Sequence, residues 1–125
     1  MEKKHGLVAL LLLLLLVACD PTDNYGYPSK INFGKEGGTK FCSGRLIVSG
    51  ISINDYNGNG IAELTKDEND TIITKYYWLT VKFKRLVGHE IKIIAEPNTT
   101  GKKRTLYVSG SIFNDGPTIK VTQDK

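Results

Sequence analysis

The sequence predicts an all-β fold, and three observations carry that prediction. Short segments in which apolar and polar residues alternate recur from Lys30 onward. Turn signals rich in Gly, Asn and Pro separate them at the spacing of about 8 to 12 residues that is typical of sandwiches. No stretch after Cys19 carries apolar residues at helical spacing over a convincing length. About seven short strands in roughly 95 residues indicate an immunoglobulin-like antiparallel β-sandwich, with a small barrel as the alternative.

The strands are expected in the following order. Ile31 and Phe33 belong to the first, which the glycine-rich turn Gly34–Gly38 follows. A β-branched run from Leu46 to Ile53 forms the second, and Thr71–Lys75 leads directly into a strand whose buried face contains Tyr77, Leu79, Val81 and Phe83. The remaining inward residues are predicted to be Ile91, Ile93, Ala95, Leu106, Val108, Ile119 and Val121.

The N-terminus predicts export followed by lipid attachment. The apolar run Leu7–Ala18 has 12 residues, whereas a membrane-spanning helix needs roughly 20. It is therefore expected to be an export signal. Ala18 directly precedes Cys19, and this pattern resembles the lipobox of bacterial lipoproteins. The resemblance implies that Cys19 is acylated with diacylglycerol after cleavage, and the alternative is an ordinary signal peptide with an incidental cysteine.

These observations divide the chain into three parts. Residues 1–18 are expected to be the lipoprotein signal peptide, residues 19–28 a lipid-anchored tether, and residues 29–125 the sandwich domain. Two or three acyl chains suffice for stable anchoring, so the expected partner of Cys19 is the membrane surface. The expected location is the outer membrane or the cell surface, and Asp20 and Asp23 weakly resemble an acidic surface-export signal.

Charge and cysteine content narrow the function classes. The formal net charge is +4, from 17 Lys and Arg against 13 Asp and Glu. This mild balance argues against nucleic-acid binding. If Cys19 carries lipid, Cys42 is left without a disulfide partner and is expected to be packed and inert.

The C-terminal half of the chain carries a recognisable pattern. It contains Trp78-Leu79-Thr80-Val81, then Ile91-Lys92-Ile93, then Glu96-Pro97-Asn98-Thr99-Thr100-Gly101 with Arg104 shortly after, and finally Ile119-Lys120-Val121-Thr122-Gln123. This pattern, together with Phe33 and Glu36-Gly37-Gly38-Thr39, resembles the BACON domain, a Bacteroidetes-associated carbohydrate-binding module. The resemblance covers about residues 29 to 124 and implies an immunoglobulin-like sandwich and a role in glycan contact.

The segment Asn54–Lys75 departs from that family pattern, because it is longer and more acidic than the usual connection. Its first part matches a calcium loop that starts at Asp55, with Gly60 at position 6 and Glu63 at position 9. Position 12 is Lys66, which replaces the bidentate carboxylate with a cation. We therefore predict an Asn-Gly turn or loop without a metal site, and weak calcium binding by residues 55–68 stays an open alternative.

Carbohydrate binding generally needs an exposed aromatic face beside polar groups. The candidate contacts are Tyr56, near the tip of the Asn/Gly segment, and Tyr76 and Trp78 on one parity of their strand. The favoured interpretation of Trp78 is that it fills the sandwich core, which leaves the two tyrosines as the better contacts.

The sequence does not indicate an enzyme active site. After signal removal His89 is the one histidine, and the sequence holds neither a nucleophile motif nor a metal-ligand set. No cofactor is expected. Asp70-Thr71-Ile72 resembles an acceptor for O-glycosylation of exported Bacteroidetes proteins, which makes Thr71 a candidate modification site.

The sequence thus leads to a non-catalytic envelope lipoprotein that binds glycans or mediates adhesion. The rival is a structural spacer or protein-interaction module that binds no carbohydrate. Two or more aromatics exposed on one face would favour the first function. A buried Trp78 with scattered tyrosines would favour the second.

Overall fold

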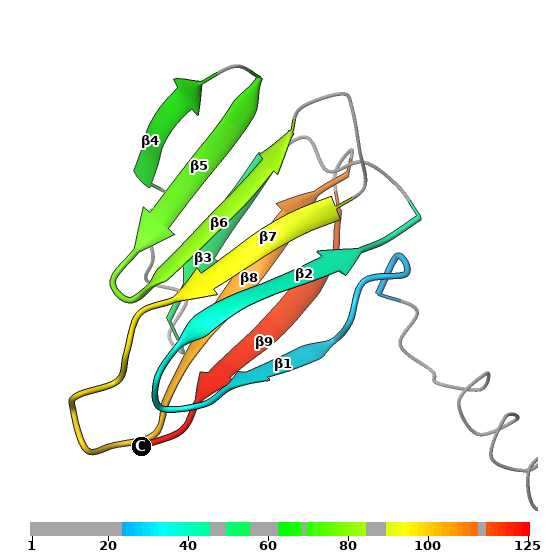
Figure 1. Cartoon of the computed structure of the whole chain (residues 1–125). Helices are drawn as coiled ribbons and strands as arrows, with labels where there is room; N and C mark the ends of the chain where they lie inside the picture. Colours follow the sequence, from blue (N-terminus) through cyan, green and yellow to red (C-terminus); the bar gives the residue numbers. More distant parts are fainter. Residues whose placement is uncertain (1–23, 46–49, 56–62, 69, 85–89, 113–114) are drawn as a thin grey trace, which may run out of the picture.

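Two packed β-sheets form the fold, a β-sandwich (Figure 1). The structure is a computed structural model that describes residues 24–45, 50–55, 63–68, 70–84, 90–112 and 115–125, with the backbone alone for 63–68. The strands in these residues are β1 Lys30–Phe33, β2 Gly38–Ser43, β3 Gly50–Asn54, β4 Glu63–Glu68, β5 Thr71–Tyr76, β6 Leu79–Lys84, β7 Glu90–Ala95, β8 Arg104–Ser111 and β9 Thr118–Gln123.

The chain crosses between the two sheets four times. One sheet has the order β1-β9-β8-β3 and the other the order β2-β7-β6-β5-β4. Neighbouring strands are antiparallel except β1 and β9, which pair in parallel. In the described part of the chain, no helix is long and apolar enough to cross a membrane.

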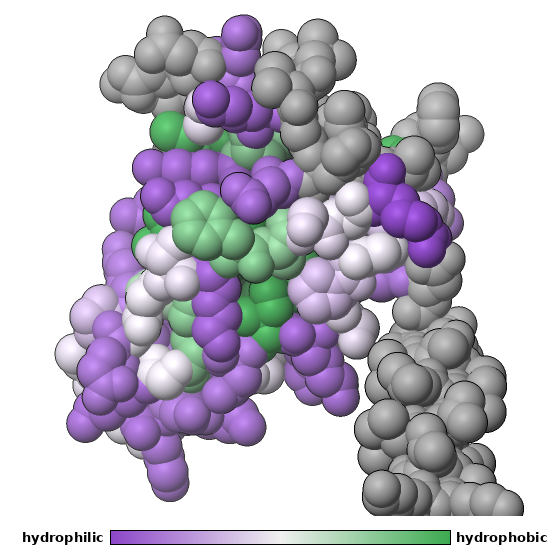
Figure 2. Space-filling view, turned by 45° about the vertical axis from the view of Figure 1, so that its right-hand side comes forward, coloured by the Kyte–Doolittle hydropathy of each residue, from purple (hydrophilic) through white to green (hydrophobic). Residues whose placement is uncertain are grey.

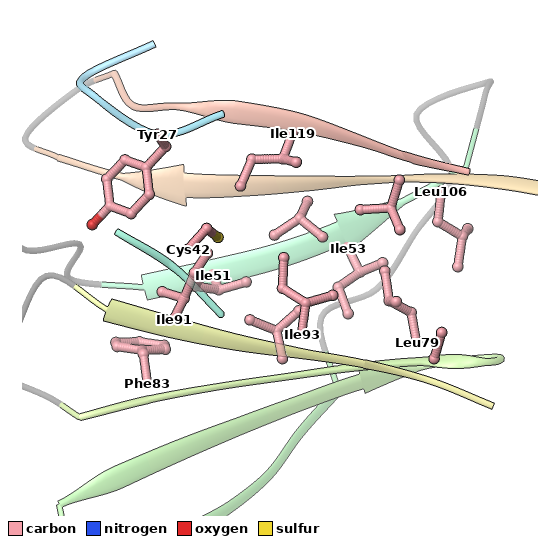
Figure 3. Close-up of a cluster of buried hydrophobic side chains, with 14 of the residues drawn as sticks. Tyr27, Cys42, Ile51, Ile53, Leu79, Phe83, Ile91, Ile93, Leu106 and Ile119 are labelled. Carbon is pink, nitrogen blue, oxygen red and sulfur yellow. The ribbon is translucent and has the colours of Figure 1, made fainter. Parts of the chain in front are cut away.

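The core lies between the inward faces of the two sheets, where their side chains point toward one another (Figure 3). The prediction of alternating inward residues is confirmed for β6 to β9. The buried residues there are Leu79, Val81, Phe83, Ile91, Ile93, Ala95, Leu106, Val108, Ile119 and Val121. Because alternate residues of a strand face opposite sides, this pattern fixes the outward residues as well.

The sandwich prediction is confirmed, but the described residues contain nine strands and not about seven. One reason is that the predicted strand through Thr71–Lys84 is a hairpin. Tyr76 pairs with Leu79, which leaves Tyr77 and Trp78 as a two-residue turn. Tyr77 was expected on the buried face, and it is exposed because the turn interrupts the alternation.

A second reason lies in the acidic segment predicted as a loop. Its residues Glu63–Glu68 form β4, which pairs with β5 and has a register shift between Leu64 and Lys66. Residues 56–62, including Tyr56 and most of the calcium-like loop, lie outside the described residues, as do 46–49 at the predicted start of the second strand. The described flanks of the calcium-like loop are the strands β3 and β4.

The residues just before β1 are packed against the sandwich. Tyr27 is buried in the core. The Asn24 side-chain amide donates to the Thr118 carbonyl at 2.8 Å, and its oxygen accepts from the Thr118 amide at 3.0 Å. The packed part of the chain therefore extends N-terminal of the predicted boundary at residue 29 and includes the described end of the predicted tether.

Cys42 faces the core from β2, and burial followed by the charge of Glu90 raises the pKa of its thiol to about 12. Because the thiolate is the reactive form, we predict that native Cys42 reacts with a disulfide reagent at pH 8 at least 100-fold more slowly than in denaturant. Absorbance during labelling measures both rates.

The same shift has a consequence for stability. The pKa of Cys42 in the folded protein lies above the ordinary value of 9.0. The buried neutral thiol therefore contributes its full stability to the fold below pH 9, and this stability is lost as the pH rises toward 12. The Cys42→Val variant should lose less stability over that interval than the wild type. Equal losses of stability in the wild type and in Cys42→Val, or fast labelling of Cys42 in the native protein, would show that the thiol is accessible to solvent.

Candidate functional site

Tyr77 is the most exposed large aromatic of the described residues. It lies in the turn between β5 and β6 at a φ of 51°, and its side chain is 72 % exposed. Two-residue hairpin turns need a positive φ, which Gly and Asn adopt readily and an aromatic residue rarely does. The turn therefore holds a tyrosine ring in solvent against its own backbone preference.

Tyr76 supports this ring from the last position of β5. The two ring centroids are 4.4 Å apart with the planes at 61°, an edge-to-face contact. Tyr76 itself is half-buried. Burial raises the pKa of its phenol, and Tyr77 and the carboxylate of Asp55 raise it further. We call the group Asp55, Lys75, Tyr76 and Tyr77 the tyrosine tip.

Two residues of the tyrosine tip, Lys75 and Asp55, are charged. Lys75 Nζ lies 3.3 Å from a carboxylate oxygen of Glu96, which follows β7. Asp55 ends the described part of the chain after β3 and is electrostatically coupled to Tyr76. The predicted contact Tyr56 is the next residue and lies outside the described residues. The tip thus combines an exposed ring with charged groups, as sugar contact requires.

Trp78 points inward from the same turn. It is 7 % exposed, and the Arg104 guanidinium carbon lies 4.6 Å from its ring centroid. Its ring therefore packs in the core, as the favoured interpretation of Trp78 expects, and it also stacks with a cation. It offers no open face for a sugar.

Arg104 and Gln123, two polar residues that carry the family resemblance, form a partly buried network beside Trp78. Arg104 Nε donates to Gln123 Oε1 at 2.7 Å, and Gln123 Nε2 donates to the carbonyls of Glu96 at 2.7 Å and Gly34 at 3.2 Å. Arg104 Nη2 donates to the carbonyls of Glu96 and Pro97. These bonds join the ends of both sheets, so the network positions the fold rather than a ligand.

Asn98 anchors the loop between β7 and β8. Its side-chain amide donates to the carbonyls of Lys102 at 2.8 Å and Asp124 at 2.9 Å, and its oxygen accepts from the Thr100 amide and hydroxyl. Its residue is 1 % exposed. The predicted Asn-Thr turn is therefore stabilised by hydrogen bonds to its own buried Asn98 side chain.

The predicted modification site Thr71 is the first residue of β5 and is half-buried on the outward face. It pairs with Glu68 and Lys84, so it stands in a strand and not in the expected loop. The neighbouring Asp70 has a φ of 61° and is exposed in the turn.

Sequence reasoning missed Tyr77 and Phe41, the two large apolar or aromatic side chains that are most exposed among the described residues. A signal for Tyr77 was present. The inward residues of β5 have even numbers, Ile72 and Thr74, and those of β6 have odd numbers. Such a change of parity indicates a two-residue turn between two strands. The face of the molecule that Figure 2 shows is largely hydrophilic, with apolar areas near its centre.

A solved structure of a protein from Bacteroides thetaiotaomicron has a similar fold. The two chains share 19 % sequence identity with a TM-score of 0.54, over 85 % of this chain and 88 % of that chain. A likeness at this identity shows the fold alone. No protein-family model and no curated protein matches the chain.

We predict that Asn98→Ala lowers the free energy of unfolding by about 2 to 4 kcal/mol, because four hydrogen bonds to a buried side chain are lost. Urea denaturation measures the change. Asn32→Ala is the matched control, since Asn32 is exposed and bonds to Asp124 and Thr122 at the same end of the fold. Similar losses in both variants would contradict the assigned role of Asn98.

Proposed function

We propose that this protein is a non-catalytic glycan-binding or adhesion module of the cell envelope, which contacts sugars through the tyrosine tip. The observation that carries the proposal is the Tyr77 ring, 72 % exposed at a backbone angle that its residue type disfavours. A residue that costs backbone energy and buries little area contributes little to folding. Its ring is suited to stacking on the apolar face of a sugar.

The rest of the tip fits the same function. Tyr76 meets the Tyr77 ring edge-on, with the ring centroids 4.4 Å apart. Lys75, next to Tyr76 in β5, pairs with Glu96, and the charge of Asp55 raises the pKa of Tyr76. Tyr56, the other tyrosine contact suggested by the sequence, follows Asp55 in the chain and lies outside the described residues.

The resemblance to the BACON domain supports this proposal in part. The matching residues Trp78, Arg104 and Gln123 act in the structural network, so the resemblance bears on the sandwich and not on the sugar site. The glycan-binding role therefore depends on the tyrosine tip and not on the family pattern.

A structural spacer or protein-interaction module is the second candidate. The burial of Trp78 favours it, since the tryptophan is removed from the set of exposed aromatics. The strand order favours it as well, because β2 and β4 are the two edges of the five-stranded sheet and can accept a further strand.

The lipid anchor at Cys19 and the location at the outer membrane or cell surface belong to the same proposal, and Cys19 lies outside the described residues. We expect mass spectrometry of the protein from the membrane fraction to find residue 19 at the N-terminus with a diacylglycerol thioether. An unmodified Cys19 would contradict the anchor.

For the tyrosine tip, we predict that Tyr77→Asn weakens glycan binding by about tenfold, a loss of about 1.4 kcal/mol. Asparagine tolerates the positive φ, so the melting temperature should be maintained or raised. Glycan arrays of the full chain identify the ligand, and calorimetry then measures the affinity of each variant.

For a neutral glycan, Phe41→Ala is the control for that experiment, because Phe41 is an exposed aromatic residue on another surface. Unchanged affinity in Tyr77→Asn would remove the tip as the binding site. No binding to any glycan at millimolar concentration would favour the spacer function.

A further inference from the structure

The outward face of the five-stranded sheet carries a row of side chains across four adjacent strands. In register, Phe41 of β2 lies opposite Lys92 of β7, and Lys92 lies opposite Lys82 of β6, which in turn faces Ile73 of β5. The residues flanking these positions along β6 and β7 are buried, so the row projects from the outer face. We call Phe41, Lys92 and Lys82 the lysine row.

The two lysines of this row are an unfavourable pair for folding. Like charges directly opposite in neighbouring antiparallel strands repel, with side-chain origins about 5 Å apart. Neither Lys82 nor Lys92 forms a salt bridge with a described residue. Glu90 lies on the same face two residues before Lys92 but forms no salt bridge with either lysine, so an anion from outside the chain would relieve the repulsion further.

Phe41 adds an aromatic surface to the same place. It is 60 % exposed, and Lys92 Nζ lies 5.8 Å from its ring centroid. The row borders a shallow hollow of about 480 Å³, whose remaining lining is Thr71, Phe83, Lys84 and Glu90. Three lysines against one glutamate give the hollow an excess of positive charge.

We propose that the lysine row binds an acidic polysaccharide, with carboxylate or sulfate groups paired to Lys82 and Lys92 and a sugar ring stacked on Phe41. This is a second binding surface beyond the tyrosine tip, and it is carried by different residues. The row spans about 10 Å, two strand spacings, along one line. An extended polyanion can therefore contact the ring and both ammonium groups at once.

A polysaccharide fits these groups better than an anionic membrane does. The acyl chains expected on Cys19 already suffice for anchoring, so a basic patch would add little to membrane affinity. The row also pairs its charges with an aromatic ring on a flat sheet, which suits stacking by a sugar ring.

The test compares two pairs of polymers that differ in charge: dextran sulfate with dextran, and polygalacturonate with its methyl ester. We expect the full chain to bind the acidic member of at least one pair at least tenfold more tightly than its neutral partner. Raising the salt concentration should weaken this binding. The double variant Lys82→Gln/Lys92→Gln should lose about tenfold in affinity, from about threefold per charge.

The melting temperatures of the variants show whether the lysine row serves binding or the stability of the fold. Removing one lysine relieves the repulsion, so Lys82→Gln should keep its melting temperature or raise it by about 1 to 3 °C. Phe41→Ala should weaken binding as well. The matched control is Lys102→Gln/Lys103→Gln, which removes two exposed charges from the loop between β7 and β8 and should change affinity less than twofold.

Three results would overturn the inference. Equal affinity for neutral and acidic polymers would remove the role of charge while leaving glycan binding at the tyrosine tip intact. An equal loss in the Lys102/Lys103 control would show diffuse attraction. Binding to phosphatidylglycerol vesicles without binding to either acidic polymer would identify a membrane surface instead. The Tyr77→Asn variant distinguishes the two surfaces, because it should leave acidic-polymer binding unchanged.

Discussion

The stacking of Arg104 on Trp78, together with the hydrogen bonds that Arg104 and Gln123 make, is the constraint on which the rest of the structure depends. Arg104 and Gln123 come from the four-stranded sheet, whereas Trp78 and Glu96 lie in the connections that directly adjoin strands of the five-stranded sheet. The network therefore closes one end of the sandwich and ties down the loop that crosses from β7 to β8. Burial lowers the pKa of Arg104 and Glu96 partly opposes this, yet no buried side-chain polar atom of the described residues lacks a partner. The inward position of Trp78 also determines the geometry of the tyrosine tip, because in this two-residue turn Trp78 points into the core and Tyr77 points into solvent.

The parts of the fold that were predicted from the sequence are those that a strict alternation specifies. Leu79, Val81 and Phe83 of β6 and Ile91, Ile93 and Ala95 of β7 are buried as expected, because one sheet face must be apolar to form the core. The prediction failed at Tyr77, where two alternating strands with opposite parity follow each other through an aromatic turn. It failed also at β4, whose polar sequence carries no alternation and whose position depends on pairing with β5. Strand pairing is a long-range property, and local periodicity does not contain it.

The candidate site was predicted less completely than the fold, and particular residues show why. Tyr76 was identified, but the neighbouring Tyr77, which carries most of the exposed ring surface, was assigned to the core. The exposure of Phe41 was not predicted, because Cys42 beside it is also apolar. The alternation of β2 therefore does not indicate which of the two residues faces inward. The family pattern could not correct these errors. Trp78, Asn98, Arg104 and Gln123 are spaced as the fold requires, and residues that hold a loop and a turn in place are recognisable whatever ligand the surface binds.

Both candidate surfaces are places where the sequence conflicts with the stability of its own fold. At the tyrosine tip, an aromatic residue occupies a positive φ that asparagine or glycine would adopt with less strain. In the lysine row, Lys82 and Lys92 lie opposite each other on adjacent strands, where a pair of opposite charges would be favourable. Tyr25 and Asp70 also have positive φ angles, 57° and 61°, whereas every buried side-chain polar atom of the described residues has a partner. Such local conflicts are expected at positions where function decides the residue, and those at the tyrosine tip and in the lysine row lie on the outer surface of the fold. The two conflicts differ in kind, since one exposes a ring and the other concentrates charge, and two surfaces with different ligand chemistry follow from that difference.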